Sequence, residues 1–246
     1  MDTGLKGKTV LITGASRNMG RLAALAFARE GANLALCTSA KMNELQQVAN
    51  EARALGAKVV AERCDVADDA AVASFVRKIR GELGSVHVAL NNAVYRGAEG
   101  AFLDETEESW KRNFQVNLGG PRNICRAVLP LMIEQRWGRI INFSGIAPFL
   151  GMSVTKGMAK LGIIGFTRGL AREFAEHEIT ANCIGPGTID VERDAFQKSK
   201  PLRPMQPIRR LGKPQEVVSL MIYLASEDAG FITGQCYLVN GGMYFQ

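Results

Sequence analysis

The chain has 246 residues, of which 47% are hydrophobic and 22% are charged, and its formal net charge is +6. This length and composition suit one α/β domain with a sizeable core. No apolar stretch approaches the roughly 20 residues that a membrane span needs. The two histidines and five scattered cysteines offer no metal-binding cluster.

The cysteines and the N-terminus bear on where the protein works. None of the five cysteines forms a CxxC pair, which predicts reduced thiols rather than disulfides. A strand pattern begins by Lys8, so no signal or transit peptide is visible, and we expect a cytoplasmic protein. The basic charge fits either a solvated surface or the attraction of an anionic ligand, and no motif indicates nucleic-acid binding.

Strand and helix patterns alternate along the whole chain. Apolar, β-prone runs predict strands at 8–13, 33–38, 58–62, 86–91, 138–144, 179–184 and 236–240. Helical spacing predicts helices at 19–30, 42–55, 68–83, 154–177 and 214–225, and a mostly helical segment at 105–135. This alternation predicts a single domain over residues 1–246, an α/β, Rossmann-like, doubly wound parallel sheet.

Folds of this class bind ligands beyond the carboxyl ends of their strands. The first such segment, 13–20, is rich in glycine and lies between a strand and a helix. Gly14 permits a sharp turn, Gly20 permits close packing of the helix on the sheet, and the helix N-terminus favours a phosphate group. The pattern predicts a pyrophosphate site, although a purely structural turn would look the same.

Further short motifs follow in order along the chain. They are Thr13-Gly-x-x-x-Asn18-x-Gly20, Cys64-Asp65-Val66, Asn91-Asn92-Ala93, Asn117, Gly138-Arg139-Ile140-Ile141-Asn142, Lys160, Pro186-Gly187 and Val239-Asn240-Gly241-Gly242. Together they resemble the short-chain dehydrogenase/reductase family, most closely its β-ketoacyl-ACP-reductase-like branch, over essentially the whole chain. The resemblance implies a nicotinamide-binding fold and an oxidoreductase.

The resemblance also implies the residues that hold the cofactor. Gly14, Ser16, Arg17, Asn18, Met19 and Gly20 would line the pyrophosphate and ribose, Asp65 and Val66 the adenine, Asn91 and Ala93 the nicotinamide ribose, and Pro186, Gly187, Thr188 and Ile189 the carboxamide. Asn18 replaces the family's middle glycine. Because asparagine tolerates left-handed backbone, we expect the turn to be kept.

Cofactor choice depends on the segment after the second predicted strand. An acidic residue there would bind the ribose 2′-hydroxyl of NAD, but 37–41 contains none. Thr38 and Ser39 offer hydroxyls, and Arg17 and Lys41 offer positive charge near the position of a 2′-phosphate. The sequence therefore predicts a preference for NADP(H) over NAD(H).

The catalytic positions depart from the family pattern. Members of the family use a Tyr-x-x-x-Lys pair, a serine and an asparagine, and here Lys160 matches the lysine and Asn117 the asparagine. Lys156 stands where the resemblance places the tyrosine. The expected serine position is Gly145, with Ser144 just before it, and the segment 145–156 is about two residues shorter than in the family.

Three hypotheses for this position remain open. Lys156 itself transfers the proton, because two ammonium groups at i and i+4 depress the pKa of one of them. Alternatively Tyr95, Ser144 or a water molecule supplies the proton. In the third hypothesis the domain binds the nucleotide but has lost its chemistry, and serves as a binding or regulatory subunit.

The resemblance has implications for substrate and partners as well. It implies a carbonyl, enone or enoyl thioester substrate, with an acyl carrier protein as a candidate partner. It implies a homotetramer or homodimer formed through the helices at 105–135 and 154–177 and the last strand. The charged, proline-containing segment 189–207 is expected to cover the substrate, either as a lid or as an ordinary loop.

Overall fold

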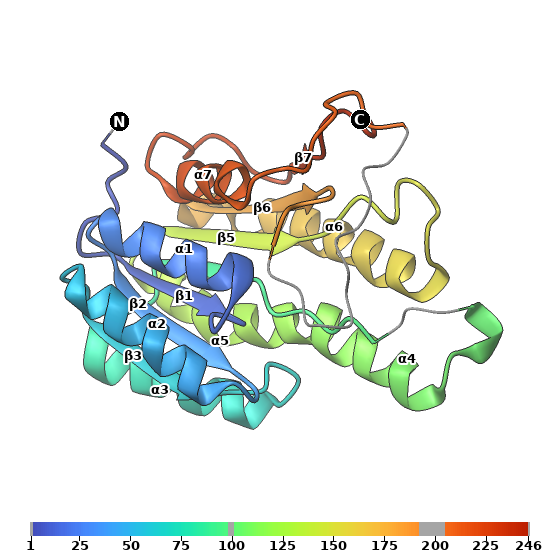
Figure 1. Ribbon diagram of the computed structural model, residues 1–246. Coiled ribbons are helices and arrows are strands. Elements are labelled where there is room, and N and C mark those ends of the chain that lie inside the picture. Colours follow the sequence, from blue (N-terminus) through green and yellow to red (C-terminus); the bar gives the residue numbers. More distant parts are fainter. Residues whose placement is uncertain (1, 98–100, 192–204, 246) are drawn as a thin grey trace.

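A computed structural model describes residues 2–97, 101–191 and 205–245. The described residues form one parallel sheet of seven strands in the order β3-β2-β1-β4-β5-β6-β7 (Figure 1). The strands are β1 (Thr9–Thr13), β2 (Asn33–Thr38), β3 (Val59–Arg63), β4 (Val88–Asn91), β5 (Gly138–Phe143), β6 (Ile179–Pro186) and β7 (Cys236–Val239). The predicted doubly wound α/β fold is confirmed.

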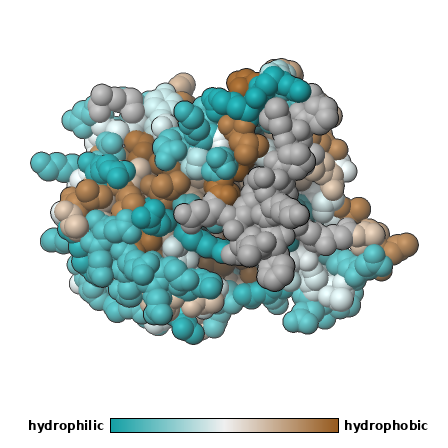
Figure 2. Space-filling model, in the orientation of Figure 1, coloured by the Kyte–Doolittle hydropathy of each residue, from teal (hydrophilic) through white to brown (hydrophobic). Residues whose placement is uncertain are grey.

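The helices cover both faces of the sheet (Figure 1). They are α1 (Asn18–Arg29), α2 (Met42–Ala54), α3 (Asp69–Leu83), α4 (Glu107–Phe114), α5 (Gly120–Glu134), α6 (Val154–Phe174) and α7 (Pro214–Ala225), with short turns η1 (Phe102–Asp104), η2 (Gln115–Gly119) and η3 (Ala175–His177). One apolar cluster joins α1, α2 and α7 to the sheet, and a second joins α3, α5 and α6. Hydrophilic side chains coat the outer surface of α2 and α3 (Figure 2).

The inner strand β1 shows why the sheet needs both layers. All five residues of β1 are buried, with Val10 and Ile12 in the α1 cluster and Leu11 in the α3 cluster. Each such side chain contributes about 1.5–3 kcal/mol when it is fully buried. The strand order reverses between β1, which pairs with β2 on one side, and β4. The carboxyl ends of β1 and β4 therefore flank the crevice where this fold class binds ligands.

The segment predicted as mostly helical over 105–135 contains a local irregularity. The α4 helix leads through the π-helical turn η2 into α5, so the chain stays helical but gains one residue in the turn. Pro121 lies in the first turn of α5, and Pro130 lies inside the helix. None of the described helices is both long and apolar enough to cross a membrane.

Helix caps differ between helices. Asp68 caps α3 by accepting the N–H of Ala71, and Thr106 caps α4 by accepting the N–H of Ser109. Neither Arg17 before α1 nor Ser153 before α6 makes a side-chain cap. The two helices that begin at the crevice thus keep first-turn N–H groups for other acceptors.

Candidate active site

A cavity of about 910 Å³ opens at the carboxyl edge of the sheet. This is within the range of roughly 300–1,000 Å³ that is common for ligand sites. The predicted cofactor residues that line it are Gly14, Ser16, Arg17, Asn18, Met19, Gly20, Thr38, Ser39, Lys41, Asp65, Val66, Ala93, Lys160, Pro186, Gly187, Thr188 and Ile189. Asn91 is not part of the lining; it is buried behind it and donates to Asn142 Oδ1 at 2.8 Å.

The Gly-rich turn after β1 has no room for side chains. A Cβ on Gly14 would lie 3.0 Å from Ala93 Cα, and a Cβ on Gly20 would lie 2.2 Å from the carbonyl oxygen of Gly14. Asn18 takes the left-handed conformation, with φ +50°, as expected for an asparagine in place of glycine. The turn therefore keeps its shape despite the substitution.

Asn92 holds this turn in place from the neighbouring strand end. Its Nδ2 donates to the carbonyl oxygens of Thr13 at 2.9 Å and Gly14 at 3.1 Å. The hydroxyl oxygen of Thr13 in turn accepts the N–H of Ala93 at 2.9 Å. The sequence prediction omitted Asn92 from the site, although the Asn-Asn-Ala motif contained it.

One end of the cavity lies beside β2 and is called here the β2 end, formed by Ser16, Thr38, Ser39 and Lys41 with Asp65. The hydroxyl oxygens of Ser16 and Thr38 are 3.5 Å apart. Asp65 is paired with Arg112 of α4, whose guanidinium lies 2.6 Å away. Arg112 could not be recognised from local sequence patterns, because its partner is 47 positions away.

The other end lies at the start of α6 and is called here the α6 end, formed by Arg96, Lys156 and Lys160. Lys160 is 7% exposed, and its ammonium donates to the carbonyl oxygen of Phe143 at 2.7 Å. Burial lowers the pKa of Lys160 to about 8, and the positive charges of Lys156 and Arg96 act in the same direction. A lysine with this pKa exchanges protons near neutral pH.

Ser144 lies at the same end, but its hydroxyl proton is engaged. Its Oγ donates to the backbone carbonyl of Lys160 at 2.8 Å, and the side chain is buried. Gly145 also lines the cavity and has no hydroxyl to offer. In this arrangement Ser144 ties the end of β5 to α6.

Asn117 lies outside the cavity lining, in the η2 turn. Its Oδ1 accepts the N–H of Tyr95, and its Nδ2 donates to the Tyr95 carbonyl, both at 3.0 Å. The Nδ2 also donates to Asn113 Oδ1 at 2.6 Å. Asn117 therefore fixes the backbone of Tyr95, whose side chain does line the cavity.

The four tyrosines lie in different parts of the structure. Tyr95 lines the large cavity. Tyr237 and Tyr244 line a second cavity of about 620 Å³ beside the edge strand β7. Tyr223 lies on α7 and is 37% exposed. It points outward while its neighbours Met221 and Leu224 are buried.

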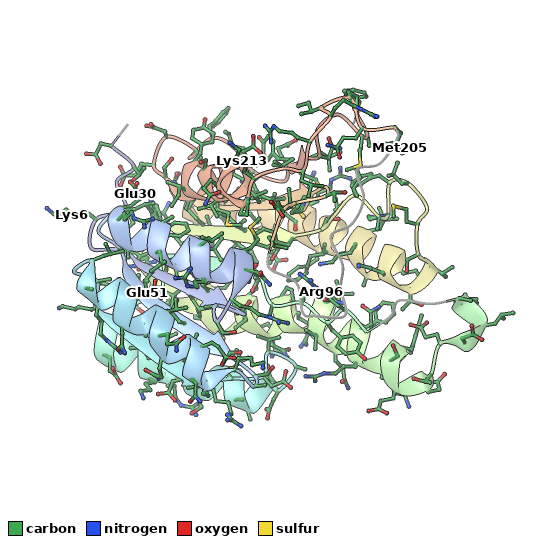
Figure 3. The ribbon with its side chains drawn as sticks, viewed as in Figure 1. Lys6, Glu30, Glu51, Arg96, Met205 and Lys213 are labelled. Carbon is green, nitrogen blue, oxygen red and sulfur yellow. The ribbon has the colours of Figure 1, made fainter. Side chains whose placement is uncertain are left out.

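Lys156 lies in the first turn of α6, one helical turn before Lys160, and both line the cavity. Figure 3 labels Arg96, which belongs to the loop after β4. The sequence prediction missed Arg96, because a basic residue in a loop gives no signal by itself.

Of the predicted covering segment 189–207, residues 192–204 lie outside the described part, and Ile189 and Val191 line the cavity.

The chain is similar to known reductases and dehydrogenases along nearly its whole length. A family model described as Enoyl-(Acyl carrier protein) reductase matches residues 14–244. The 3-oxoacyl-[acyl-carrier-protein] reductase FabG of Escherichia coli (strain K12) is 34% identical over 244 residues, which cover 97% of this chain and 98% of the relative. The 2-keto-3-deoxy-L-fuconate dehydrogenase of Xanthomonas campestris pv. campestris is 34% identical over 256 residues, which cover 98% of this chain and 81% of the relative.

The fold agrees with solved structures of similar sequence. A short-chain type dehydrogenase/reductase from Mycobacterium marinum matches with a TM-score of 0.89 at 30% identity, covering 98% of this chain and 97% of that chain. The family model, the two relatives and the solved structure each match nearly the full length of this chain. The chain therefore belongs to the short-chain dehydrogenase/reductase family.

Proposed function

We propose that the protein is an NADP(H)-dependent oxidoreductase that acts on a carbonyl, enone or enoyl thioester. The observation that carries this proposal is that the Gly-rich turn and the buried Lys160 open into one cavity. The names of the two relatives described above are those of a reductase and a dehydrogenase for compounds with an oxo or keto group. The catalytically silent alternative has no observation in its favour.

Residues at the turn fit a dinucleotide. Gly14 and Gly20 leave a backbone surface that a Cβ would fill, and α1 begins there without a side-chain cap. Asn18 Oδ1 is buried and has no hydrogen-bond partner within the described part of the chain. These features support a pyrophosphate beside the first turn of α1, since helix N-termini and close backbone approach favour phosphate.

The β2 end supports a preference for NADP(H). Thr38 ends β2 and Ser39 follows it with no acidic residue there, and the basic residues Arg17 and Lys41 line the same cavity. Among the described lining residues the one carboxylate is Asp65, and Arg112 neutralises it. A 2′-phosphate there would meet hydroxyls and positive charge.

At the α6 end we propose that Lys156 occupies the place of the family's tyrosine and supplies the proton. When bound, the reduced nicotinamide supplies the hydride. The ammonium of Lys156 donates a proton to the substrate oxygen as it gains negative charge, and the resulting amine takes a proton back from solvent. Lys160 would hold the nicotinamide ribose and would keep positive potential beside the reacting oxygen. Ser144 is less suited to this role, because its proton is held by the Lys160 carbonyl.

The test follows NADPH oxidation with a panel of ketones, enones and acyl thioesters. Replacing Lys156→Met should lower kcat by about 10²–10⁴-fold, the usual contribution of a positioned acid. Tyr95→Phe should change kcat less than about threefold if the tyrosine only packs. Lys111→Met is the matched control, because Lys111 is an exposed lysine paired with Glu107 on α4. A large loss in Tyr95→Phe with none in Lys156→Met would assign the proton to Tyr95 instead.

We also propose that the protein forms a homo-oligomer through α6. Val154, Met158 and Leu161 are each more than half exposed on one face of this helix. Exposed apolar side chains in such a row are typical of an interface. A dimer or tetramer by light scattering at micromolar concentration is the expected result, and a monomer would contradict it. We also propose an acyl carrier protein as a partner, because the net charge of +6 favours an acidic protein.

A further inference from the structure

Two cysteines face each other across the last two strands of the sheet, β6 and β7 (Figure 1). Cys183 of β6 is the register partner of Cys236 of β7, and the N–H of Cys183 donates to the carbonyl oxygen of Gln235 at 2.8 Å. Opposed residues of a parallel pair project from the same face of the sheet. Both side chains accordingly belong to one small apolar cluster, with Ile163 and Ile164 of α6.

The two sulfur atoms also interact directly. The thiol of Cys183 donates a hydrogen bond to Cys236, and this bond, together with burial, holds the pKa of Cys183 well above its ordinary value. The other contact of this thiol, to the carbonyl oxygen of Ile184 at 3.9 Å, is long for a hydrogen bond. A hydrogen bond accepted by a sulfur favours its thiolate form. Of the two cysteines, Cys236 is therefore the more reactive nucleophile.

The backbone spacing suits a bond between these sulfurs. Neighbouring strands lie about 4.8 Å apart, and a disulfide joins Cα atoms that are roughly 4.4–6.8 Å apart. Within the described sheet β7 is an edge strand that pairs with β6, so it can adjust towards β6 without disturbing another strand. The pair can therefore be linked with little movement of the backbone.

The other three cysteines are less well placed for a disulfide. Cys37 is opposite Glu62 in the register, and Cys64 lies two positions further along, just beyond β3. The thiols of Cys37 and Cys64 interact, but diagonal neighbours in a sheet are about 7–8 Å apart, which exceeds the usual span of a disulfide. Cys125 is buried on α5 and accepts a contact from the amide of Asn91. The geometry therefore favours the pair between β6 and β7.

A cavity gives small molecules a route to Cys236. It is the cavity of about 620 Å³ beside β7, whose lining includes Cys236 with its neighbours Tyr237 and Leu238. Cys236 is 8% exposed, whereas the other four cysteines are at most 2% exposed. Hydrogen peroxide is not much larger than water, so it can reach the more reactive of the two sulfurs through this cavity.

We propose that Cys183 and Cys236 form a peroxide-reactive site, at which hydrogen peroxide converts their two thiols to a disulfide. The sulfur of Cys236 attacks one peroxide oxygen, the O–O bond breaks, and a sulfenic acid forms while the other oxygen leaves as water with the thiol proton. The sulfur of Cys183 then attacks that of Cys236, the S–S bond forms, and the sulfenic oxygen leaves as water with the proton of Cys183. The thiols lose two electrons, which reduce the peroxide to two molecules of water. This site does not depend on the proposed oxidoreductase.

Peptide mapping tests the proposal on the whole protein. The wild type is treated with hydrogen peroxide, unfolded, alkylated with iodoacetamide and digested, with and without prior reduction by dithiothreitol. We expect two of the five thiols to escape alkylation, a linked peptide that joins Cys183 to Cys236, and recovery of both thiols after reduction. A protein that keeps all five thiols, or that links a different pair, would overturn the proposal.

Alanine variants test the order of the two steps. Cys236→Ala should abolish the reaction at both positions, because it removes the attacking sulfur, and oxidation of Cys183 in this variant would contradict that assignment. Cys183→Ala should stop at the sulfenic acid of Cys236, which dimedone traps. The matched control is Cys125→Ala, which removes a buried thiol on α5 and should form the linked peptide at the wild-type rate. The map of the wild type decides the proposal even if a variant does not fold.

Discussion

In the described part of the chain, one cation is buried at the amino edge of the sheet and another at the carboxyl edge, and their surroundings differ. At the amino edge Arg139 is 4% exposed, and its guanidinium donates to the carbonyl oxygens of Ser226, Gly138 and Glu178 at 3.0–3.2 Å. It also lies 4.3 Å from the ring centre of Trp137. At the carboxyl edge Lys160 is 7% exposed, and its ammonium has the Phe143 carbonyl as its hydrogen-bond acceptor.

This difference separates a structural cation from a functional one. An ammonium has three N–H donors, so the contact with Phe143 leaves capacity for ligand oxygens. The guanidinium at the amino edge is already surrounded by carbonyl groups and an aromatic ring, and it has no role toward a ligand. A buried cation with incomplete hydrogen bonding costs stability, and such groups gather where binding needs them.

The largest expected effect is at the amino edge. Arg139→Met should destabilise the protein by about 3 kcal/mol, because it removes charge-assisted hydrogen bonds and leaves buried carbonyl groups without donors. Urea unfolding at pH 7 measures this. Arg136→Met, at an exposed arginine that bonds to the Glu176 carbonyl, should cost less than about 1 kcal/mol. Equal effects of the two variants would remove the distinction between a structural cation and a surface one.

Lys160→Met should have the opposite sign, with a gain of about 1–3 kcal/mol at pH 7 and a loss of cofactor binding. The folded pKa of about 8 lies below the ordinary value of 10.5, so folding disfavours the charged form. This penalty is complete below pH 8 and disappears as the pH rises to 10.5. The stability gain of the variant should therefore shrink across that interval in urea titrations. A variant that is less stable than the wild type at pH 7 would show that Lys160 is a structural cation like Arg139.

A smaller effect is expected at His87 on the amino edge. Its Nδ1 accepts the N–H of Thr9 at 3.0 Å, and burial, with the nearby charge of Lys8, lowers its pKa to about 4. The unfolded chain takes up this proton near pH 6.5, so stability falls as the pH drops from 6.5 towards 4. Because His87 is partly exposed, the expected loss in the free energy of unfolding is only about 1–2 kcal/mol. His87→Gln should flatten this part of the pH dependence in thermal unfolding, and an unchanged slope would exclude the histidine as its source.

Much of the fold follows from local sequence patterns. The β1 strand and its turn are recognisable because apolar residues, Gly14 and Gly20 are adjacent in sequence. The position of Lys156 and Lys160 at the cavity follows from their spacing of one helical turn. Asn18 is also understandable in advance, because its side chain is one of the few that tolerate φ +50°.

Contacts between distant residues could not be predicted in this way. The pairing of Asp65 with Arg112, and the placement of Arg96 at the α6 end, depend on the packing of α4 and of the loop after β4. Asn117 was expected at the reacting centre, but the η2 turn directs it to the backbone of Tyr95. The hydrogen bond from Ser144 to the Lys160 carbonyl likewise depends on how the loop after β5 returns the chain to α6.

The most direct test of this account is a fluorescence titration with NADPH and NADH of the wild type and of Lys160→Met. We expect the wild type to bind NADPH at least tenfold more tightly than NADH. We also expect at least a tenfold loss of affinity for both cofactors in a Lys160→Met protein that is folded and no less stable. Absence of binding by the wild type, or unchanged binding by the variant, would contradict the assignment of the carboxyl edge as a nicotinamide cofactor site.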